Sequence, residues 1–564
     1  MADRVDAEKA ASLPSSPDTD GHTEKEHAQE EMGFEPIRTR NTNVRPGSKA
    51  GSVSRTISRT RSQNGYSCDD YPGDNSDEDT AAGSPGAQTP EDKDPFEVGF
   101  DGGNADPMCP RSMGTGRKWL IVSIVSGASF CVTAASSIYT STYAQMDAEF
   151  HSSRIVSTLG LSTFVLGISL GPMFLGPLSE FFGRRPIYLV SWSAYLIWII
   201  PQAVARNIAT MIVARFFDGL AGSAFLAVSG GTVSDLFTRQ DLQGPMLLYS
   251  LAPFIGPAVG PAVGGFINYN ANWRWTYYVL LIWTFIQMLM IVFFVPETYH
   301  PIILRDKAKK KRKETGDDRW KAPMEKTDKS ILKTVGISLM RPFQLLIFEP
   351  MVLCLCIFSA ILLGILYLFF GAFPLVFRNT HGFNLWQVGL SFLGIMVGLL
   401  LAAAADPIFH GIRDRLMARL ERETGVAGKS EPEFRLPPAI CGAFLVTIGI
   451  FIFGWTSYGH VHWIAPIIGS SIFGAGTLLV FTGIFTFLVD AYPLYAASAL
   501  AANAFVRCLF AAAFPLFGNQ MYNKLGYQWA SSLLGFLTLL MLPFPYLFFR
   551  YGKRIRGNSR YATD

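Results

Sequence analysis

A small number of ionisable side chains lie inside long stretches of the sequence that carry no other charge. In the run Arg215-Phe-Phe-Asp218-Gly219 a cation and an acid are three residues apart, and on a helix that spacing places both on one face. If the helix crosses a membrane, a bare Arg at its centre costs about 3 kcal/mol, so we expect Arg215 and Asp218 to neutralise each other. They form either a structural ion pair or, if Asp218 can release its Arg partner, a proton site.

A second candidate is Arg507, which follows Asn503 by one helical turn in another uncharged stretch. Ionisable residues inside a membrane are functional candidates, and we expect Arg507 either to contact a substrate or to pair with an acid elsewhere. Aromatic side chains in a third stretch could form a pocket for flat, apolar, weakly basic or neutral molecules, or they could face lipid or pack within the protein. These are Tyr367, Phe369, Phe370 and Phe373.

Another set of charges stands where an apolar stretch ends. Residues 176–186 read Gly-Pro-Leu-Ser-Glu-Phe-Phe-Gly-Arg-Arg-Pro. Gly183 permits a tight turn, and the carboxylate of Glu180 at the helix end can hold the two arginines that follow. Residues 406–415 repeat the order of an acid, a Gly and basic residues, and this repetition indicates a chain built from two related halves.

Glycines and prolines form a further motif in the fifth apolar stretch. Residues 256–265 read Gly-Pro-Ala-Val-Gly-Pro-Ala-Val-Gly-Gly. Glycines four apart line one face of a helix and allow a neighbouring backbone to approach closely, while the prolines remove backbone donors and bend the helix. We expect this segment to be a packing face. Its members are Gly256, Gly260, Pro261, Gly264 and Gly265.

The elements that must hold these residues are long uncharged segments. Hydrophobic residues make up 49% of the 564 residues and charged residues only 16%, whereas a soluble domain carries about 25% charge. Crossing a bilayer requires about 20 apolar residues, and a soluble protein would not bury so many segments of that length. We predict twelve membrane-spanning helices over 118–140, 156–178, 186–205, 208–235, 244–267, 275–296, 347–372, 386–409, 437–456, 463–489, 496–518 and 527–549.

The twelve predicted helices divide into two groups of six, with acids at matched positions. Asp235 ends the fourth helix and Asp490 ends the tenth. Lys and Arg gather in the loops on one side, which predicts that this side and both termini are cytosolic. The predicted parts are a disordered cytosolic tail over 1–112, a six-helix bundle over 113–296, a basic cytosolic linker over 297–345, a six-helix bundle over 346–550 and a cytosolic tail over 551–564.

The predicted N-terminal tail is rich in Ser, Asp, Glu, Gly, Pro and Thr, a composition typical of disorder. Ser58 and Ser62 each follow an Arg by three positions, which suits kinases that prefer basic sequences. Phosphorylation there would add negative charge to a basic patch. The alternative is a solvated tail without a regulatory role.

Three of these motifs together resemble those of the major facilitator superfamily, and in particular fungal drug:proton antiporters with twelve spans. The pattern G-x-L-x-D-x-x-G-R-R/K is similar to residues 176–185, with Glu in place of Asp. The pattern G-x-x-x-G-P-x-x-G-G agrees with residues 256–265 at every fixed position. The pattern R-x-x-Q-G is similar to residues 215–219, with an acid where Gln is common. The resemblance covers roughly residues 115–550.

The resemblance implies an all-α membrane protein with two pseudo-symmetric six-helix halves, which rock about a central site to give alternating access. It implies a cytosolic charge cluster of Glu180, Arg184 and Asp235, beside Arg185, that locks the outward-facing state. It also implies export, because the pattern in residues 256–265 marks antiporters within this superfamily.

We therefore expect proton-driven export of small amphipathic organic compounds: azole-type drugs, xenobiotics or toxic secondary metabolites. The expected location of this monomer is the plasma membrane, with the vacuolar membrane as the alternative. The proton gradient must supply the energy, because residues 425–430 resemble only the end of an ATP-binding loop and Glu423 stands where its first Gly is required. No cofactor or nucleic-acid partner is expected, and the Cys354-x-Cys356 spacing does not suit zinc.

Two other functions stay open. A transporter of the same fold could carry polyamines or nutrients, but a polycation would favour several acids, and Asp218 is the one strong acid that the sequence places in mid-span. A membrane sensor that transports nothing would need a large folded soluble domain, which a disordered tail does not provide. An enzyme is not expected, because the sequence contains no catalytic constellation.

Overall fold

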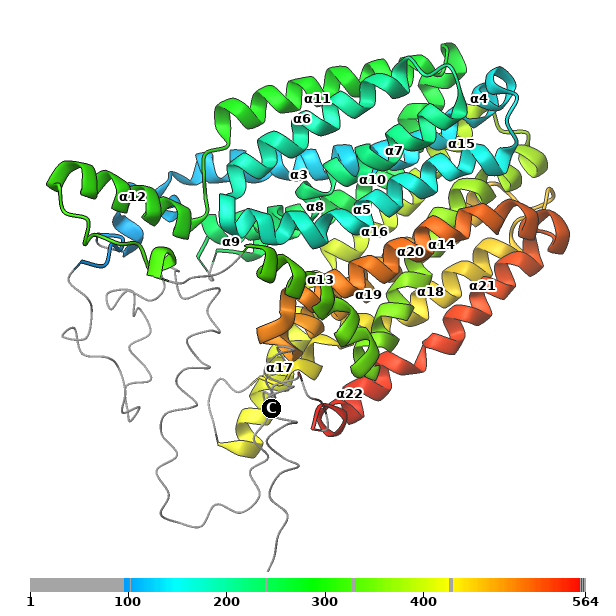
Figure 1. The fold of residues 1–564 in the computed structure, drawn as a ribbon. Coiled ribbons are helices and arrows are strands. Elements are labelled where there is room, and N and C mark those ends of the chain that lie inside the picture. The colour runs from blue at the N-terminus through cyan, green and yellow to red at the C-terminus, as the bar shows by residue number, and fades with distance from the viewer. Residues whose placement is uncertain are drawn as a thin grey trace, which may run out of the picture. The chain divides into compact units, whose positions relative to one another are not determined.

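The structure is a computed structural model that describes residues 96–101, 103–238, 241–326, 331–425, 430–557, 559 and 561 (Figure 1). Ser58, Ser62 and most of the predicted tail lie outside the described residues, as do residues 426–429 of the segment that resembles an ATP-binding loop. Within the described ranges the secondary structure is helical, apart from one isolated β-bridge between Glu97 and Lys321.

Among the described residues, six long segments precede the linker. The first and fourth consist of consecutive shorter helices, and the others are single helices. In chain order they are α3 (Thr115–Ile138) with η6 (Tyr139–Thr142) and α4 (Tyr143–Phe150), α5 (Arg154–Phe182), α6 (Arg184–Ala203), α7 (Ile208–Gly222) with α8 (Ala224–Ala227) and α9 (Ser229–Leu236), α10 (Gln243–Asn270), and α11 (Arg274–Phe294).

Six more segments follow the linker. In chain order they are α14 (Pro350–His381), α15 (Leu385–Ser391) with α16 (Leu393–Ala404) and α17 (Asp406–Thr424), α18 (Pro437–Trp455), α19 (Ile464–Ala491), α20 (Ala496–Leu525), and α21 (Tyr527–Met541) with α22 (Pro543–Arg556). Short 3-10 helices η8 (Pro432–Arg435) and η9 (Pro493–Tyr495) lie in the loops before α18 and α20.

Eleven of these segments in the described part of the chain are long and apolar enough to cross a membrane. The remaining one is α6, whose 20 residues include several Trp, Tyr, Ser and Pro residues and a Gln, and which takes the third place in the order. The prediction of an all-α membrane protein with twelve spans in two groups of six is therefore confirmed. The ends differ from the prediction where polar helices extend the spans: α17 runs to Thr424, and α22 carries the last span to Arg556, into the predicted C-terminal tail.

The predicted linker contains helices of its own. They are α12 (His300–Thr315), η7 (Pro323–Lys326) and α13 (Ile331–Phe348). α13 packs against α5, α14 and α20, so the boundary predicted at residue 346 falls inside a helix that already contacts both groups. From the sequence we predicted only a basic linker in this segment and placed no helices in it.

The last part of the predicted disordered tail is ordered, which corrects that prediction for residues 96–101 and 103–112. Short helices η4 (Gly103–Ala105) and η5 (Pro110–Ser112) form there, and Lys307 of α12 donates to Asp106 Oδ2 at 2.5 Å. This segment contains few apolar side chains. They pack with α12 and residue 322 into one small cluster. The cluster consists of Val98, Phe100, Cys109, Leu304, Ala308 and Ala322.

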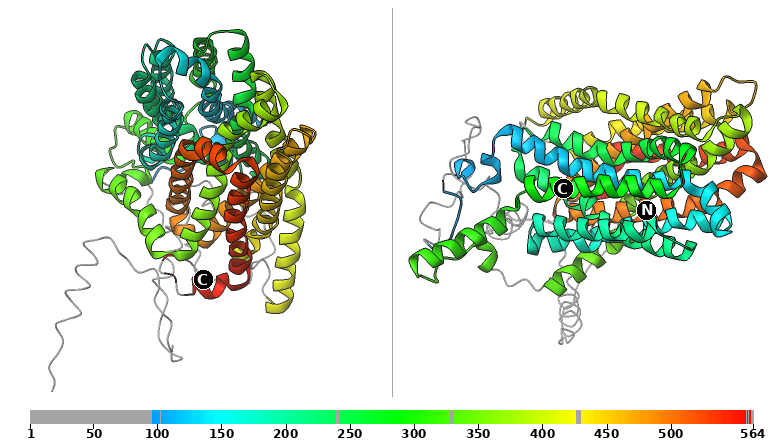
Figure 2. Two further views of the ribbon diagram at one scale, coloured as in Figure 1. Left: turned by 90° about the vertical axis from the view of Figure 1, so that its right-hand side faces the viewer. Right: turned by 90° about the horizontal axis from the view of Figure 1, so that it is seen from above.

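The two groups of six helices contact each other along several helices. α10 of the first group packs against α15 and α16 of the second, and α5 packs against α20. Figure 2 shows the same ribbon from two further sides. Ser162 Oγ donates to the Ala512 carbonyl at 2.6 Å, and the hydroxyls of Ser136 and Tyr367 lie 3.0 Å apart. These contacts place α3, α5, α14 and α20 at the junction between the halves.

Candidate functional site

The glycines of α10 form a face that lies directly against α3. A Cβ atom added to Gly256 would lie 2.8 Å from the Ala134 nitrogen, and one added to Gly260 would lie 2.6 Å from the Ala134 carbonyl oxygen. A Cβ atom at Gly264 would lie 3.0 Å from the Ile138 carbonyl oxygen. Real Cβ atoms do not approach backbone this closely, so the glycines permit the contact, as the sequence predicts.

The other face of α10 contacts the second half of the molecule. A Cβ atom at Gly265 would lie 2.9 Å from the Leu385 carbonyl oxygen, and one at Gly389 of α15 would lie 3.0 Å from the Cα atom of Ala262, beside Pro261. The rings of Phe266 and Trp386 stack at the same place, with centroids 5.6 Å apart. The motif therefore joins α3 and α15, a bridging role that spacing within one helix does not reveal.

Arg184 and Asp235 come together where α5 turns into α6. Their Nε and Oδ2 atoms are 3.4 Å apart, and Arg184 Nη1 also donates to Ser179 Oγ at 2.6 Å. Glu180 is exposed at the end of α5. We name Gly183, Arg184, Asp235 and Glu297 the loop cluster. The expected pairing of Arg184 with the acid that ends the fourth span is present in the structure.

Glu297 is a member of the loop cluster that sequence reasoning did not assign. Its carboxylate accepts from the backbone N–H of Arg184 at 2.9 Å and from that of Arg185 at 3.1 Å. Gly183 has φ +98°, and a Cβ atom there would collide with the Glu297 carboxylate. Glu297 thus binds the first N–H groups of α6, where a helix favours an anion. The signal in the sequence was its position directly after the apolar run of the sixth span.

The matching acid in the second half uses a different partner. Asp490 Oδ2 is 2.6 Å from Nε of Arg435, which belongs to η8. Arg413, which the repeated loop pattern sets beside the second-half acid, has no hydrogen-bond partner on its buried Nε within the described residues. Asp406 instead contacts His410 at 3.2 Å. The acids occur at matched positions, and their basic partners come from the equivalent loops before α6 and α18, but Arg435 lies outside the repeated pattern of residues 406–415.

Arg215 is fully buried and does not pair with Asp218, contrary to the sequence prediction. Each of its three donor nitrogens binds a backbone carbonyl of α3 or α5. Nε donates to Gly160 at 3.2 Å, Nη1 to Ala135 at 3.0 Å and Nη2 to Ser136 at 3.2 Å. The rings of Tyr139 and Phe164 lie 4.3 Å from its guanidinium carbon. The guanidinium is satisfied by carbonyl dipoles and aromatic faces, so it needs no acid.

Asp218 is directed toward α6. Its Oδ2 accepts from Gln202 Nε2 at 2.8 Å, and Gln202 also donates to the Trp198 carbonyl at 3.0 Å. Oδ1 is buried and has no hydrogen-bond partner among the residues that the structure describes. Residues three apart on a helix differ by about 60° in direction, which is enough for Arg215 and Asp218 to reach different neighbouring helices.

In α20, Asn503 and Arg507 make different contacts. Asn503 Nδ2 donates to Ser359 Oγ at 2.7 Å and so ties α20 to α14. Arg507 lies among aromatic rings: its guanidinium carbon is 5.3 Å from the centroid of Phe481 and 5.0 Å from that of Phe485. The two sequence candidates are one turn apart but do not form a common site.

Known proteins resemble this chain over most of its length. Residues 125–515 match the Major Facilitator Superfamily. The chain is 56% identical over 484 residues to "Efflux pump atB" of Aspergillus terreus, covering 86% of this chain and 93% of that protein. It is 43% identical to "Probable drug/proton antiporter YHK8" of Saccharomyces cerevisiae, covering 84% and 91%. This chain belongs to the Major Facilitator Superfamily.

A solved structure supports the same fold. The xylose transporter XylE from Escherichia coli, in a partially occluded inward-open conformation, matches with a TM-score of 0.55 and 15% sequence identity over 77% of this chain and 98% of that one. This superfamily member is therefore a multi-pass membrane transporter and not an enzyme. The names of its relatives support efflux transport.

The aromatic residues of α14 are part of the core of this transporter. Phe369 and Phe373 are fully buried and pack on Phe453 of α18, with ring centroids 5.0 Å and 5.3 Å apart. Tyr367 differs, because its hydroxyl reaches Ser136 in the first half. Of the two interpretations, packing describes Phe369 and Phe373, while Tyr367 lies at the junction of the halves.

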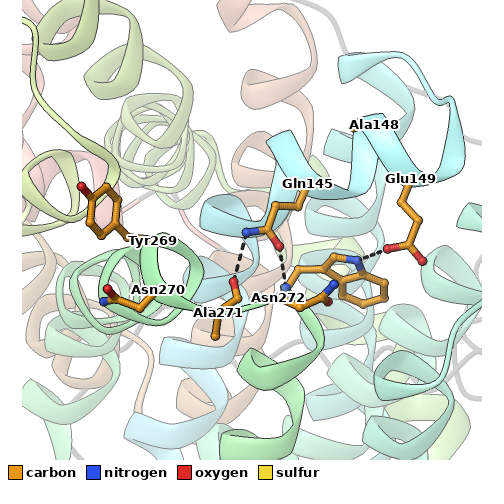
Figure 3. A pocket seen from close by; sticks show the side chains of 8 residues that line it. Gln145, Ala148, Glu149, Tyr269, Asn270, Ala271 and Asn272 are labelled. Carbon is orange, nitrogen blue, oxygen red and sulfur yellow. Dashed lines mark hydrogen bonds between the residues drawn. The ribbon is translucent and has the colours of Figure 1, made fainter.

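A polar pocket of about 690 Å³ lies between α4 and the loop that joins α10 to α11 (Figure 3). Gln145 Oε1 accepts from the Trp273 backbone N–H at 2.6 Å, and Glu149 Oε2 accepts from Trp273 Nε1 at 2.7 Å. Arg274 also binds Glu149, at 2.6 Å. These hydrogen bonds hold the α10–α11 loop against α4, so we interpret the pocket as part of the scaffold.

Proposed function

We propose that this protein exports small amphipathic organic compounds in exchange for protons, by alternating access, from the plasma membrane with both termini in the cytosol. The compounds would include azole-type drugs, xenobiotics or toxic secondary metabolites. The names of the relatives, efflux pumps and a probable drug/proton antiporter, support this direction and this energy source. The absence of a complete ATP-binding loop in the sequence is consistent with it.

The observation that carries the proposal is the double contact of α10. Its glycine face lies on α3 of the same half, and Gly265 meets Leu385 of the other half. Alternating access requires the halves to move against each other around a midplane site. A helix that meets both neighbours partly through glycine backbone can slide or tilt with less side-chain rearrangement.

The loop cluster would stabilise one of the two arrangements between which the halves move. Arg184 holds Asp235, and Glu297 fastens the start of α6, so α5, α6, α9 and the chain after α11 are linked at one end of the first half. In the proposed orientation this end is cytosolic. Breaking the cluster would change how easily the first half adopts its alternative position relative to the second.

Asp218 is the proposed proton carrier. It lies in mid-span, away from the loop cluster, and its Oδ1 atom has no hydrogen-bond partner within the described residues. Because Arg215 is satisfied by carbonyl groups, protonation of Asp218 would not leave that cation without partners. Gln202 can donate to either form of the carboxyl group.

The test is efflux in cells that overproduce the protein, compared with cells that lack it, across a panel of toxic compounds. We expect lower intracellular accumulation of several compounds, and we expect that collapse of the pH gradient at constant ATP abolishes the difference. Efflux that survives collapse of the gradient but stops on ATP depletion would contradict proton coupling.

A further inference from the structure

The two mid-span arginines of this protein differ in what surrounds them. All three nitrogens of Arg215 donate to carbonyl oxygens. The Nε and Nη1 atoms of Arg507 are buried and have no hydrogen-bond partner within the described parts of the chain. A guanidinium has five N–H donors that water would otherwise satisfy. Arg507 is therefore a partly buried cation whose Nε and Nη1 donors are unused.

The surroundings of Arg507 are aromatic and come from both halves. Phe254 of α10 lies 5.9 Å from its guanidinium carbon, and Phe481 and Phe485 of α19 lie nearer. The rings of Phe254 and Phe481 stack with their centroids 5.2 Å apart. Aromatic faces attract a cation, but they do not accept its N–H groups as an oxygen does.

No carboxylate compensates this charge within the described residues. The ionisable groups near Arg507 are neutral hydroxyls and thiols, namely those of Tyr249, Tyr367, Cys356 and Cys508. The Tyr249 hydroxyl already donates to the Leu226 carbonyl, and the Tyr367 hydroxyl is hydrogen-bonded to Ser136. A partly buried cation without a counter-charge is costly in a membrane, and an incoming anion would relieve that cost.

The position of Arg507 agrees with a substrate site. It is close to the middle of α20, where the backbone carbonyls of Phe505 and Ala512 accept from the hydroxyls of Ser169 and Ser162 of α5. Substrate sites of two-half transporters lie at this depth, between the halves. At this place the cation of Arg507 lies beside the apolar ring faces of Phe254 from the first half and Phe481 from the second.

We propose that Arg507 binds the anionic group of the transported compound, and that the substrates are amphipathic organic acids with an apolar body. Carboxylates are ionised at neutral pH and fit the planar donor fork of Arg. The apolar body would lie against Phe254 and Phe481. This inference rests on the proposed export function and narrows its substrate class to acids, which excludes the azole-type drugs. It also disfavours a polycation, which Arg507 would repel.

The test uses the purified full-length protein and four matched pairs of probes: benzoate, 2-naphthoate, 4-phenylbutyrate and octanoate, each with its neutral amide. Binding is measured by calorimetry, and exchange of the bound probe is measured in proteoliposomes at equal pH on both sides. For at least one pair we expect wild type to bind the acid at least about tenfold more tightly than the amide. Membrane partition alone would favour the amide.

The variants are Arg507→Gln, Arg507→Lys and, as a matched control, Arg206→Gln in the exposed loop between α6 and α7. We expect Arg507→Gln to lose the preference for the acid, Arg507→Lys to retain part of it, and the control to retain all of it. If wild type shows no such preference for any pair, or if Arg507→Gln keeps the preference, the inference is wrong. If Arg507→Gln does not fold, Arg507→Lys takes its place: a reduced preference for the acid supports the inference, and an unchanged preference overturns it.

The outcome is separable from that of the proposed function. Acid-selective exchange at equal pH without accumulation under a pH gradient would support the role of Arg507 and contradict proton coupling. Accumulation of neutral compounds under a pH gradient without any preference for acids would support proton-coupled export and overturn the role of Arg507.

Discussion

The two halves of this transporter bury different charges in mid-span. The first half contains Arg215, whose three guanidinium nitrogens each donate to a backbone carbonyl, and Asp218, which accepts from the amide of Gln202. The second half contains Arg507, whose guanidinium has unused donors and no acid partner within the described residues. Related architecture in the two halves therefore does not imply equal buried chemistry. We propose proton exchange for the first half and substrate recognition for the second.

The packing helices show the same division. α10 approaches α3 through three glycines, whereas its counterpart α20 packs on α14 and carries Arg507 and the amide of Asn503. Small residues permit movement between helices, and polar side chains fix position. The following changes would break or sharpen this comparison.

The largest effect is expected from Gly260→Leu. A side chain there would overlap the Ala134 carbonyl and the Ile138 backbone. Overpacking of this kind costs about 1–3 kcal/mol, so efflux should fall about tenfold or more while membrane insertion persists. Drug accumulation in cells, normalised to protein in the membrane, measures it. The control is Gly336→Leu in α13, where an added Cβ meets nothing within 4 Å. Equal efflux by both variants would show that the contact between α10 and α3 is not needed for transport.

Next in size is a difference in stability between Arg215→Leu and Arg507→Leu. Hydrogen bonds to charged groups contribute about 1.5–3 kcal/mol each, and the first variant loses three of them, so its melting temperature in detergent should fall well below that of wild type. The second variant removes a partly buried cation whose Nε and Nη1 atoms have no hydrogen-bond partner within the described residues, and its melting temperature should stay equal or rise. A large fall for Arg507→Leu would show a structural role instead.

A smaller effect is expected at the acids that end the fourth and tenth spans. The Asp235 side chain is 8% exposed and that of Asp490 is 32% exposed. Exposed ion pairs contribute about 0–1 kcal/mol, so Asp490→Asn should change the efflux rate less than Asp235→Asn does. Initial efflux rates of the two variants, compared at equal expression, provide the measurement. A larger loss of efflux rate in Asp490→Asn than in Asp235→Asn would show that the ion pair of the second half, and not the loop cluster, controls the movement.

Much of the fold was predictable, because long uncharged runs of membrane-crossing length leave few alternatives. The glycine face of α10 was predictable for a similar reason, since helical periodicity alone puts Gly256, Gly260 and Gly264 on one side. The pairing of Arg215 with Asp218 was wrong because spacing within one helix cannot tell which neighbouring helix each side chain meets. The guanidinium reaches carbonyls of α3 and α5, and those acceptors leave no pattern in the sequence.

The remaining site residues depend on contacts between distant parts of the chain. Glu297 binds the start of α6 from more than a hundred positions away, and Arg435 reaches Asp490 from another loop. Neither partner could be chosen from the sequence, which offers many charged residues in both loops. The order of residues 103–112 was likewise missed, because it depends on their contact with α12.

The most direct test of the proton role in the first half is transport by Asp218→Asn in proteoliposomes. The probe is a compound that wild type exports from cells, and the folded fraction is quantified alongside. The variant should fold, because Arg215 does not rely on Asp218 and Asn can still accept from Gln202. Accumulation driven by an imposed pH gradient should vanish, while exchange of the probe at equal pH should match that of wild type. Undiminished pH-driven accumulation by the folded variant would contradict the account.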